Sequence, residues 1–344
     1  MFELILICGS LLLAALATGW ARRMALAHAV LDLPNERSSH SVATPRGGGI
    51  AIVFVVTAAA VALGAAGLLP LPLCYAVLGG LVVAAAGFAD DRRPLRPAVR
   101  LAAHFAAALW AVYWLGGLPA LQIGAHAVQL QGVGYCIAVL TVVWTLNLFN
   151  FMDGIDGIAA TEAIFIAAAG AIIGIGGSAS PAGTLGIVLA AACAGFLLWN
   201  WPPAKIFLGD VGSGYIGYVL SVLALSSGHQ NPVNAWVWLL LGGAFFADAT
   251  VTLTRRTLRH ERVHVAHRTH AYQHLALRWR SHFAVTASLA LVNLLVLLPC
   301  ALLARRFPAY AATITLATLV ALGLAVWLLG AGQDESAGAD GGLP

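Results

Sequence analysis

The sequence predicts an all-α protein that crosses a membrane about eleven times, and three observations support this prediction. Of its 344 residues, 60% are hydrophobic and only 9% are charged. A water-soluble domain of this length needs more charge to cover its surface. The apolar residues also form runs of about 20, the length with which a helix crosses a bilayer. Several acidic residues stand at the ends of these runs.

The predicted spans divide the chain into one membrane domain, residues 1–330, and a short tail. They cover approximately residues 3–21, 48–67, 73–89, 99–117, 133–151, 158–177, 184–201, 212–228, 235–253, 284–303 and 309–330. The tail, residues 331–344, is rich in glycine and acidic residues, and we expect it to be disordered in the cytoplasm.

The basic residues predict the orientation in the membrane. All but Arg305 and Arg306 of the 18 Lys and Arg residues fall in the loops after odd-numbered spans, and loops with this excess face the cytoplasm. The predicted cytoplasmic loops are about 22–47, 90–98, 152–157, 202–211 and 254–283. The first run follows Glu3 and precedes Arg22 and Arg23, so we expect an uncleaved span with its N-terminus outside. The net charge of +4 reflects this bias and is no sign of nucleic-acid binding.

The acids at the span ends indicate a site. A charge buried in lipid is costly, so a carboxylate at the membrane edge suggests a function. Asp90, Asp91, Asp153, Asp156 and Asp210 are all expected on the cytoplasmic side. Their gathering there predicts an active site, built from cytoplasmic loops and helix ends, that handles an anion through a metal ion.

The first cytoplasmic loop contains Arg46 followed by three glycines. Arg46 could meet a phosphate, and glycines let backbone amides approach an anion closely. Taken alone, this segment is better explained as an ordinary basic loop with a glycine-rich entry to the second span.

The second loop carries the adjacent acids Asp90 and Asp91. Neighbouring carboxylates at a helix end point in different directions, so one can hold a metal while the other takes a proton. Arg92 and Arg93 follow directly, so an ion-paired surface is the alternative.

The third loop gives the sharpest local signal. Asn147, Asn150, Asp153 and Asp156 recur every three residues, which would stack them along one side of a helix. A structural hydrogen-bond seam between helices is the alternative. Two carboxylates without a nearby base argue against it.

The fourth loop runs from Asn200 past Lys205 to Asp210. Pro202 and Pro203 end the preceding helix, and Asp210 is expected where the next one opens. There it would lie beside free backbone amides that attract phosphate.

The long fifth loop is rich in arginine and histidine. A zinc site is not supported, because the loop holds no Cys and no HExxH pattern. His267, Arg268 and His270 are better candidates for binding a nucleotide diphosphate. Asp248, just before the loop, needs a partner, which Arg255 or Arg256 could supply.

These motifs together resemble the polyprenyl-phosphate N-acetylhexosamine-1-phosphate transferases, glycosyltransferase family 4. The matching pieces are the Asp90-Asp91 pair, NxxNxxDGxDGIA from Asn147 to Ala159, and NxxPAKIFLGDVGS from Asn200 to Ser213. The resemblance covers roughly residues 30–285. Many relatives carry consecutive histidines in the last cytoplasmic loop, where this chain reads His267-Arg268-Thr269-His270. This variant looks like the subgroup that starts O-antigen chains.

The resemblance implies a reaction in the bacterial inner membrane. An N-acetylated sugar 1-phosphate would pass from a UDP-sugar to undecaprenyl phosphate, giving the lipid-linked sugar diphosphate and UMP. It implies Mg²⁺, with Mn²⁺ as a substitute, and suggests a homodimer. Which UDP-N-acetylhexosamine is used stays open.

The resemblance also implies roles for the residues. Asp210 would bind Mg²⁺, with Asp91 and Asp156 as further metal ligands, and Asp90 or Asp91 would deprotonate or position the lipid phosphate. Asp153, Asp156, Asn147 and Asn150 would organise the nucleotide and metal. The residues expected to bind the diphosphate or the sugar are Arg46, Asn200, Lys205, His267, Arg268 and His270.

Two other classes of protein compete with this interpretation. A secondary transporter of an anionic envelope precursor would place ionisable residues near the bilayer midplane, often in inverted repeats. Here the acids lie at span ends, and no repeat is visible. A non-catalytic scaffold would not need five aligned carboxylates.

Overall fold

The computed structural model describes residues 2–33, 42–174, 180–261 and 268–333. It is 76% helical, which confirms the all-α prediction. Two short antiparallel ribbons accompany the helices in the described ranges. They are β1 (Leu31–Asp32) with β2 (Thr44–Pro45), and β3 (Leu121–Ile123) with β4 (His126–Val128).

Apart from α12, which lies in the predicted fifth loop, the helices follow the predicted apolar runs in order. They are α1 (Phe2–Ala27), α2 (Ile50–Ala65), α3 (Leu71–Leu78), α4 (Gly80–Arg92), α5 (Pro97–Leu115), α6 (Gln131–Phe151), α7 (Ile158–Ala169), α8 (Pro181–Asn200), α9 (Asp210–Gln230), α10 (Asn234–Leu241), α11 (Gly243–Leu258), α12 (Ala271–Trp279), α13 (His282–Val292), α14 (Leu298–Arg306) and α15 (Ala311–Leu328).

The predicted number of eleven spans is not confirmed. Among the described residues, eight helices are long and apolar enough to cross a membrane. The pair α10 and α11, bent by 71°, would make a ninth. The helices α2 and α7 have only 16 and 12 residues. The run that predicted α2 includes Gly48 and Gly49, which form a turn, and α7 is followed by a π-helical turn, Gly170–Gly174.

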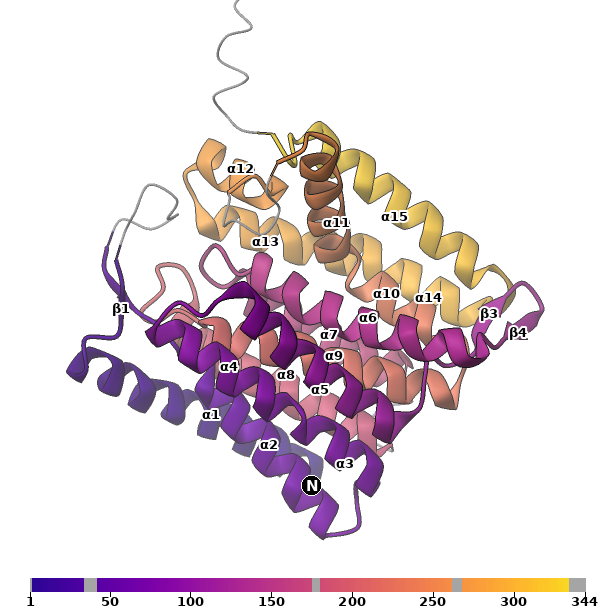
Figure 1. Cartoon of the computed structure of the whole chain (residues 1–344), viewed down its shortest axis with the longest axis horizontal. Helices are drawn as coiled ribbons and strands as arrows, with labels where there is room; N and C mark the ends of the chain where they lie inside the picture. Colours follow the sequence, from indigo (N-terminus) through magenta and orange to yellow (C-terminus); the bar gives the residue numbers. More distant parts are fainter. Residues whose placement is uncertain (1, 34–41, 175–179, 262–267, 334–344) are drawn as a thin grey trace, which may run out of the picture.

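Helix α9 forms the centre of the bundle (Figure 1). It contacts every helix from α2 to α8 and also α10. Small residues permit this packing: a Cβ on Gly217 would lie 2.7 Å from the Cα of Leu146 in α6. Asp210 is the first residue of α9. The fold therefore places this carboxylate on the axis of the bundle, at one end.

The predicted cytoplasmic loops meet at that same end. Arg46 of the first loop contacts Asp91 at the end of α4 and Asp210 at the start of α9. Asp156 of the third loop contacts Ala204 of the fourth and His282 at the start of α13. Five segments far apart in sequence thus form one surface, here called the site end.

Candidate active site

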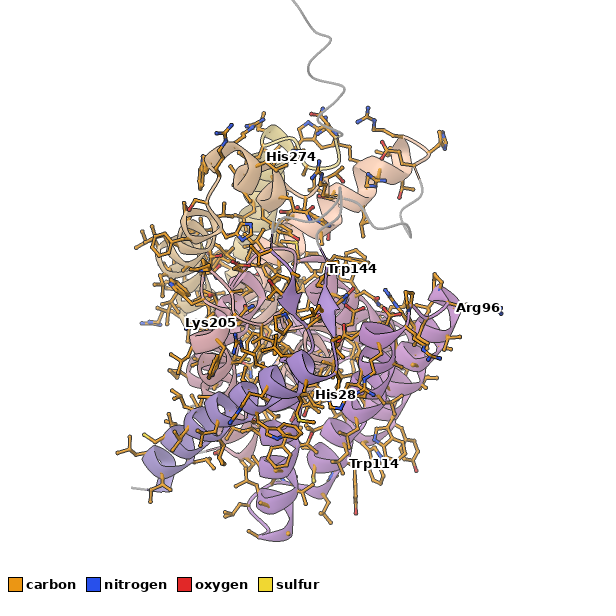
Figure 2. The ribbon with its side chains drawn as sticks, turned by 90° about the vertical axis from the view of Figure 1, so that its left-hand side faces the viewer. His28, Arg96, Trp114, Trp144, Lys205 and His274 are labelled. Atoms are coloured by element: carbon orange, nitrogen blue, oxygen red, sulfur yellow. The ribbon has the colours of Figure 1, made fainter. Side chains whose placement is uncertain are left out.

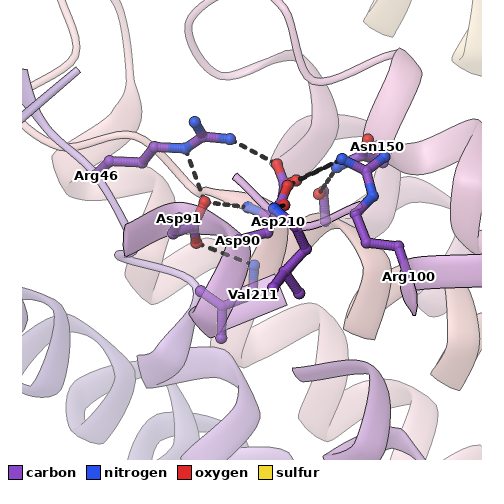
Figure 3. Close-up of polar contacts among 9 residues, drawn as sticks. Arg46, Asp90, Asp91, Arg100, Asn150, Asp210 and Val211 are labelled. Carbon is purple, nitrogen blue, oxygen red and sulfur yellow. Dashed lines mark hydrogen bonds and ion pairs between the residues drawn. The ribbon is translucent and has the colours of Figure 1, made fainter. Parts of the chain in front are cut away.

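The centre of the site end is a group of three aspartates and two arginines, here called the carboxylate cluster (Figure 3). Its members are Arg46, Asp90, Asp91, Arg100 and Asp210. Asp90 and Asp91 are contributed by α4, Asp210 by α9, Arg100 by α5 and Arg46 by the segment before α2. Asp91 is almost completely buried, whereas the two arginine side chains are about one third exposed, at 33% and 31%.

Asp91 caps the N-terminus of α9. Its Oδ1 accepts the backbone N–H of Asp210 at 2.9 Å, and its Oδ2 accepts that of Val211 at 3.2 Å. The first amides of a helix have no partner within the helix, so a carboxylate there supplies acceptors and complements the helix dipole. Gly209 permits the approach, because it has φ +77° and its Cβ would lie 2.5 Å from Asp91 Oδ2. Asp91 thereby fixes where Asp210 lies.

Asp90 and Asp210 form a close pair of carboxyl groups. They are within hydrogen-bonding reach of each other and share Arg100, whose Nη1 lies 2.9 Å from Asp90 Oδ2 and 3.7 Å from Asp210 Oδ2. Arg46 Nη2 lies 2.6 Å from Asp210 Oδ1. Two adjacent carboxylates repel each other, so the pair needs cations near it.

The expected metal ligands are not collected in one place. No group of three or more His, Cys, Asp or Glu side chains suited to a metal ion occurs in the described part of the chain. Asp91 accepts hydrogen bonds on both oxygens, and Asp156 lies in a different contact network. Asp90 accepts the Leu95 N–H on Oδ1 at 2.6 Å, but its Oδ2 faces the partly exposed Arg100 side chain and not a helix end. The donor set that fits Mg²⁺ is therefore the Asp90 and Asp210 pair. This ion commonly uses one or two protein carboxylates and completes its shell with waters and substrate phosphates.

The loop 152–157 separates its two aspartates into different surroundings. The spacing predicted that Asp153 and Asp156 continue the helical row that begins with Asn147 and Asn150. They do not, because helix α6 ends at Phe151. Asp156 Oδ2 accepts the N–H of Ala204 at 3.1 Å and lies 3.3 Å from His282 Nδ1.

Asp153 is near enough to the carboxylate cluster for the charges of the cluster to affect its pKa. Among the described residues no hydrogen bond or ion pair to its carboxyl group is seen. Burial raises the pKa of Asp153 well above its usual range, and the nearby carboxylates of Asp210, Asp91 and Asp156 add to this rise against the opposing effect of Arg46. Asp153 is therefore a carboxyl group that lacks a protein partner and gains from any cation placed beside it.

The predicted asparagines have different roles. Asn150 donates to Ser213 Oγ at 3.1 Å and lines a small cavity with Asp90, Arg100 and Asp210. Asn147 donates to Val143 O within its own helix. Asn200, expected to bind substrate, is buried and accepts from Gly157 N while donating to Ile206 O, both at 2.9 Å. Its side chain joins the third and fourth loops.

The predicted basic residues also differ in accessibility. Lys205 is exposed on the loop between α8 and α9, with Nζ 5.9 Å from the Trp199 ring centre (Figure 2). Arg268 is exposed as well. His267 lies outside the described residues. His270 is only 2% exposed, so in this conformation its side chain is not presented to a ligand.

His270 belongs to a second buried group, here called the His270 cluster, with Asp248, Ala271 and Tyr272. Asp248 Oδ1 lies 3.2 Å from His270 Nδ1. Its two oxygens accept the N–H groups of Ala271 and Tyr272, both at 3.0 Å, and so cap α12. The expectation that Arg255 or Arg256 pairs with Asp248 is wrong: these arginines bind Ala331 O and Glu261.

The His270 cluster packs against the loop 152–157. Tyr272 Oη donates to Phe151 O at 3.1 Å, and a Cβ on Gly154 would collide with that hydroxyl. Burial raises the pKa of Tyr272 well above its usual range, which keeps the phenol neutral as a donor. The first glycine of the DGxDG motif is therefore required by the approach of α12.

Several site residues were not predicted from the sequence. Arg100 completes the carboxylate cluster, and His104, one turn further along α5, lines the same small cavity. His282 binds Asp156, and Ser213 accepts from Asn150. The only signal for Arg100 and His104 is their spacing of one helical turn at the start of an apolar run, just after the acid pair.

An apolar cavity of about 310 Å³ lies mainly between α6, α9, α10 and α11, beside the 71° bend between the last two. On α9 its wall begins at Leu220, which is about 15 Å along the helix from Asp210. On α6 its wall extends from Ile137 to Phe149, one residue before Asn150, which lines the small cavity beside the carboxylate cluster. Helix α6 therefore connects the apolar cavity with the charged cluster.

A helical membrane bundle with such a paired site is suited to an enzyme that joins a lipid to a phosphate-bearing molecule. The family model for glycosyl transferase family 4 matches residues 73–228, which include Asp90, Asp91, Asp153, Asp156 and Asp210. This match and the relatives named below confirm the resemblance of the chain to this family.

Three curated proteins illustrate the similarity. The probable undecaprenyl-phosphate N-acetylglucosaminyl 1-phosphate transferase of Bacillus subtilis is 27% identical over 79% of this chain and 77% of its own length. The decaprenyl-phosphate N-acetylglucosaminephosphotransferase of Mycolicibacterium smegmatis is 29% identical over 73% and 71%. The phospho-N-acetylmuramoyl-pentapeptide-transferase of Streptococcus thermophilus is 33% identical over 53% of each chain.

Proposed function

We propose that this protein transfers an N-acetylhexosamine 1-phosphate from a UDP-sugar to undecaprenyl phosphate. The products are undecaprenyl-diphosphate-sugar and UMP. The observation that carries the proposal is the carboxylate cluster, three aspartates with two partly exposed arginines at one end of an apolar helical bundle, in a chain that resembles this family. The names of the relatives support the class of reaction, since they act on polyprenyl phosphates.

The acceptor lipid fits the apolar cavity and helix α6, which leads from it to the carboxylate cluster. A prenyl chain needs an apolar surface, which the cavity between α6, α9, α10 and α11 offers. A chain that extends from this cavity along α6 toward Asn150 would bring its phosphate to the carboxylate cluster. Arg46 and Arg100 are partly exposed there and supply the positive charge that a phosphate needs.

The divalent cation implied by the family would be held by Asp90 and Asp210. When bound, Mg²⁺ neutralises the repulsion between two phosphate-bearing substrates and polarises the diphosphate. Asp91 keeps Asp210 in place through the first two amides of α9. Asp153, unpaired within the described residues, is a further oxygen donor on the same side.

The acceptor phosphate is proposed to attack the sugar-bearing phosphorus directly, with UMP leaving. Asp90 would take the proton of a monoprotonated lipid phosphate, because Asp91 uses both oxygens to cap α9 and Asp210 is proposed as the principal ligand of the cation. Arg46 and Arg100 would hold the phosphate oxygens in line, which lowers the entropic cost of the encounter. The exposed Lys205 and Arg268 are proposed to bind the diphosphate of the donor.

The proposal includes a location and a pathway. The distribution of Lys and Arg favours a site end that faces the cytoplasm of a bacterial inner membrane, where UDP-sugars are made. The non-consecutive histidines around Arg268 favour O-antigen or a related envelope polysaccharide as the product.

The test mixes purified protein, undecaprenyl phosphate, Mg²⁺ and a panel of UDP-N-acetylhexosamines, and measures UMP. We expect release with one or a few donors, only when lipid is present, and none from Asp210→Asn. Release of UDP instead of UMP, or lipid-independent release, would contradict the proposal. Transport of a lipid precursor without any turnover would support the transporter alternative.

A further inference from the structure

The end of the described chain is fastened to the loop that carries Arg268. Residues 331–333, here called the strap, follow α15 and lie beside α11 (Figure 1). Gly332 N–H donates to Thr269 O at 2.7 Å. Arg255 Nη1 donates to Ala331 O at 3.1 Å, and the Arg255 guanidinium lies 4.1 Å from the ring centre of Trp327. Ala331 is fully buried.

Glycine is required at the centre of the strap. Gly332 has φ +76°, a conformation that other residues adopt only with strain. A Cβ there would lie 2.9 Å from Arg255 Cβ and 3.0 Å from Thr252 O. The backbone of the strap thus lies directly on α11.

The strap reaches residues 268–270, here called the donor segment. Thr269 accepts the strap through its carbonyl group, and its Oγ1 accepts from Arg256 Nη1 at 3.3 Å. On either side of Thr269 are the exposed Arg268 and the buried His270, which is held by Asp248. The strap, at Thr252 and Arg255, and the Asp248 carboxylate, one to two turns earlier, therefore both hold the donor segment against α11.

We propose that the strap is a positioning element for donor binding, which presents Arg268 to the diphosphate of the UDP-sugar. The proposal rests on the proposed transferase function. The strap touches no residue of the carboxylate cluster or of the apolar cavity. Its loss should therefore affect the donor and leave the lipid acceptor unchanged.

The experiment compares two truncated proteins with the full chain. The first ends at Gln333 and keeps the strap; the second ends at Leu329 and loses it while α15 remains complete. We expect the first to match the full chain. In the second, the KM for the UDP-sugar should rise about tenfold, as expected when one or two net hydrogen bonds are lost. The KM for undecaprenyl phosphate should not change.

A matched pair of substitutions separates the contact from backbone strain. Gly332→Ala introduces both positive-φ strain and the collision with α11. Gly330→Ala introduces the same strain at φ +95°, but its Cβ has 3.7 Å to the nearest atom, Gln333 Oε1. We expect Gly332→Ala to raise the donor KM more than Gly330→Ala does.

Limited trypsin digestion supplies a readout that is independent of activity. Cleavage at Arg268 should be faster in the chain that ends at Leu329 than in the chain that ends at Gln333. Equal cleavage rates and equal donor KM values in the two truncations would contradict the proposed role of the strap. An equal rise in the KM values for the UDP-sugar and for undecaprenyl phosphate would also contradict it. A full-length protein without transferase activity would instead overturn the proposed function, while the digestion still tests the strap.

Discussion

Two aspartates at the site end each cap the N-terminus of a helix, but the residues next to them differ in accessibility. Asp91 caps α9 through the amides of Asp210 and Val211, and Asp248 caps α12 through those of Ala271 and Tyr272. Beside Asp91 lie the partly exposed Arg46 and the Asp90 and Asp210 pair, whereas Asp248 is covered by the buried His270. The comparison teaches that an aspartate in a functional motif can serve by holding a helix end, and we propose that its accessible neighbour performs the chemistry.

The largest expected effect is at the accessible neighbour in the first region. Asp210→Asn should lower kcat by about a thousandfold, the range for a lost charge-stabilising or acid–base group. The fold should persist, since the Asp210 side chain caps nothing. Radiolabelled lipid product and the melting temperature measure the two properties. Substantial turnover at any Mg²⁺ concentration would exclude Asp210 as a metal ligand.

The capping residue of the same region should give a smaller, mixed effect. Asp91→Asn keeps one amide acceptor, loses the other and weakens the pair with Arg46. A displacement of Asp210 by about 1 Å would lower kcat about a hundredfold, accompanied by a lower melting temperature. An unchanged melting temperature would show that Asp91 acts in the chemistry rather than as a cap.

Substitution of Asp248, the capping residue of the second region, should affect the KM of only one substrate. Asp248→Asn weakens the contact with His270 and removes one acceptor at the start of α12. We expect the KM for the UDP-sugar to rise about tenfold, the effect of one or two net hydrogen bonds. Steady-state kinetics with each substrate varied in turn will show this, and an equal rise for the lipid would refute the division between the regions.

The smallest effect concerns stability at Asp153. Because its pKa is raised, the folded state binds this proton more tightly than the unfolded state, so stability is lost as pH rises from the usual aspartate range through the raised pKa. Asp153→Asn removes that loss, and without added metal it should melt a few degrees higher at pH 8 and no higher near pH 4. Asp156→Asn is the matched control: it should melt lower, because Asp156 holds Ala204 and His282.

The sequence predicted the fold class and the gathering of the acids at one end, since both follow from hydrophobic runs and charge placement. Asp210 was correctly expected at a helix start, because Pro202, Pro203 and Gly209 mark that boundary locally. The role of Asp91 depends on how closely α4 packs on α9. A Cβ on Gly87 would collide with the Asp210 backbone, and no local pattern states that proximity.

The partner of Asp248 shows the same limit. Arg255 and Arg256 are near in sequence, but they lie about two helical turns away, and His270 reaches Asp248 from another segment. The predicted number of spans stays unconfirmed, because apolar composition alone does not separate a crossing helix from a shorter one packed inside the bundle, such as α7.

The most direct measurement follows phosphorus through the reaction. UDP-N-acetylhexosamine labelled with ³²P in the β-phosphate is supplied with undecaprenyl phosphate and Mg²⁺ to the wild-type protein and to Asp210→Asn. A phosphosugar transferase centred on the Asp90 and Asp210 pair moves the label into the lipid fraction, leaves UMP unlabelled, and loses this activity with Asp210. Label that stays in UDP while sugar enters the lipid, or labelled lipid formed equally well by Asp210→Asn, would contradict the account.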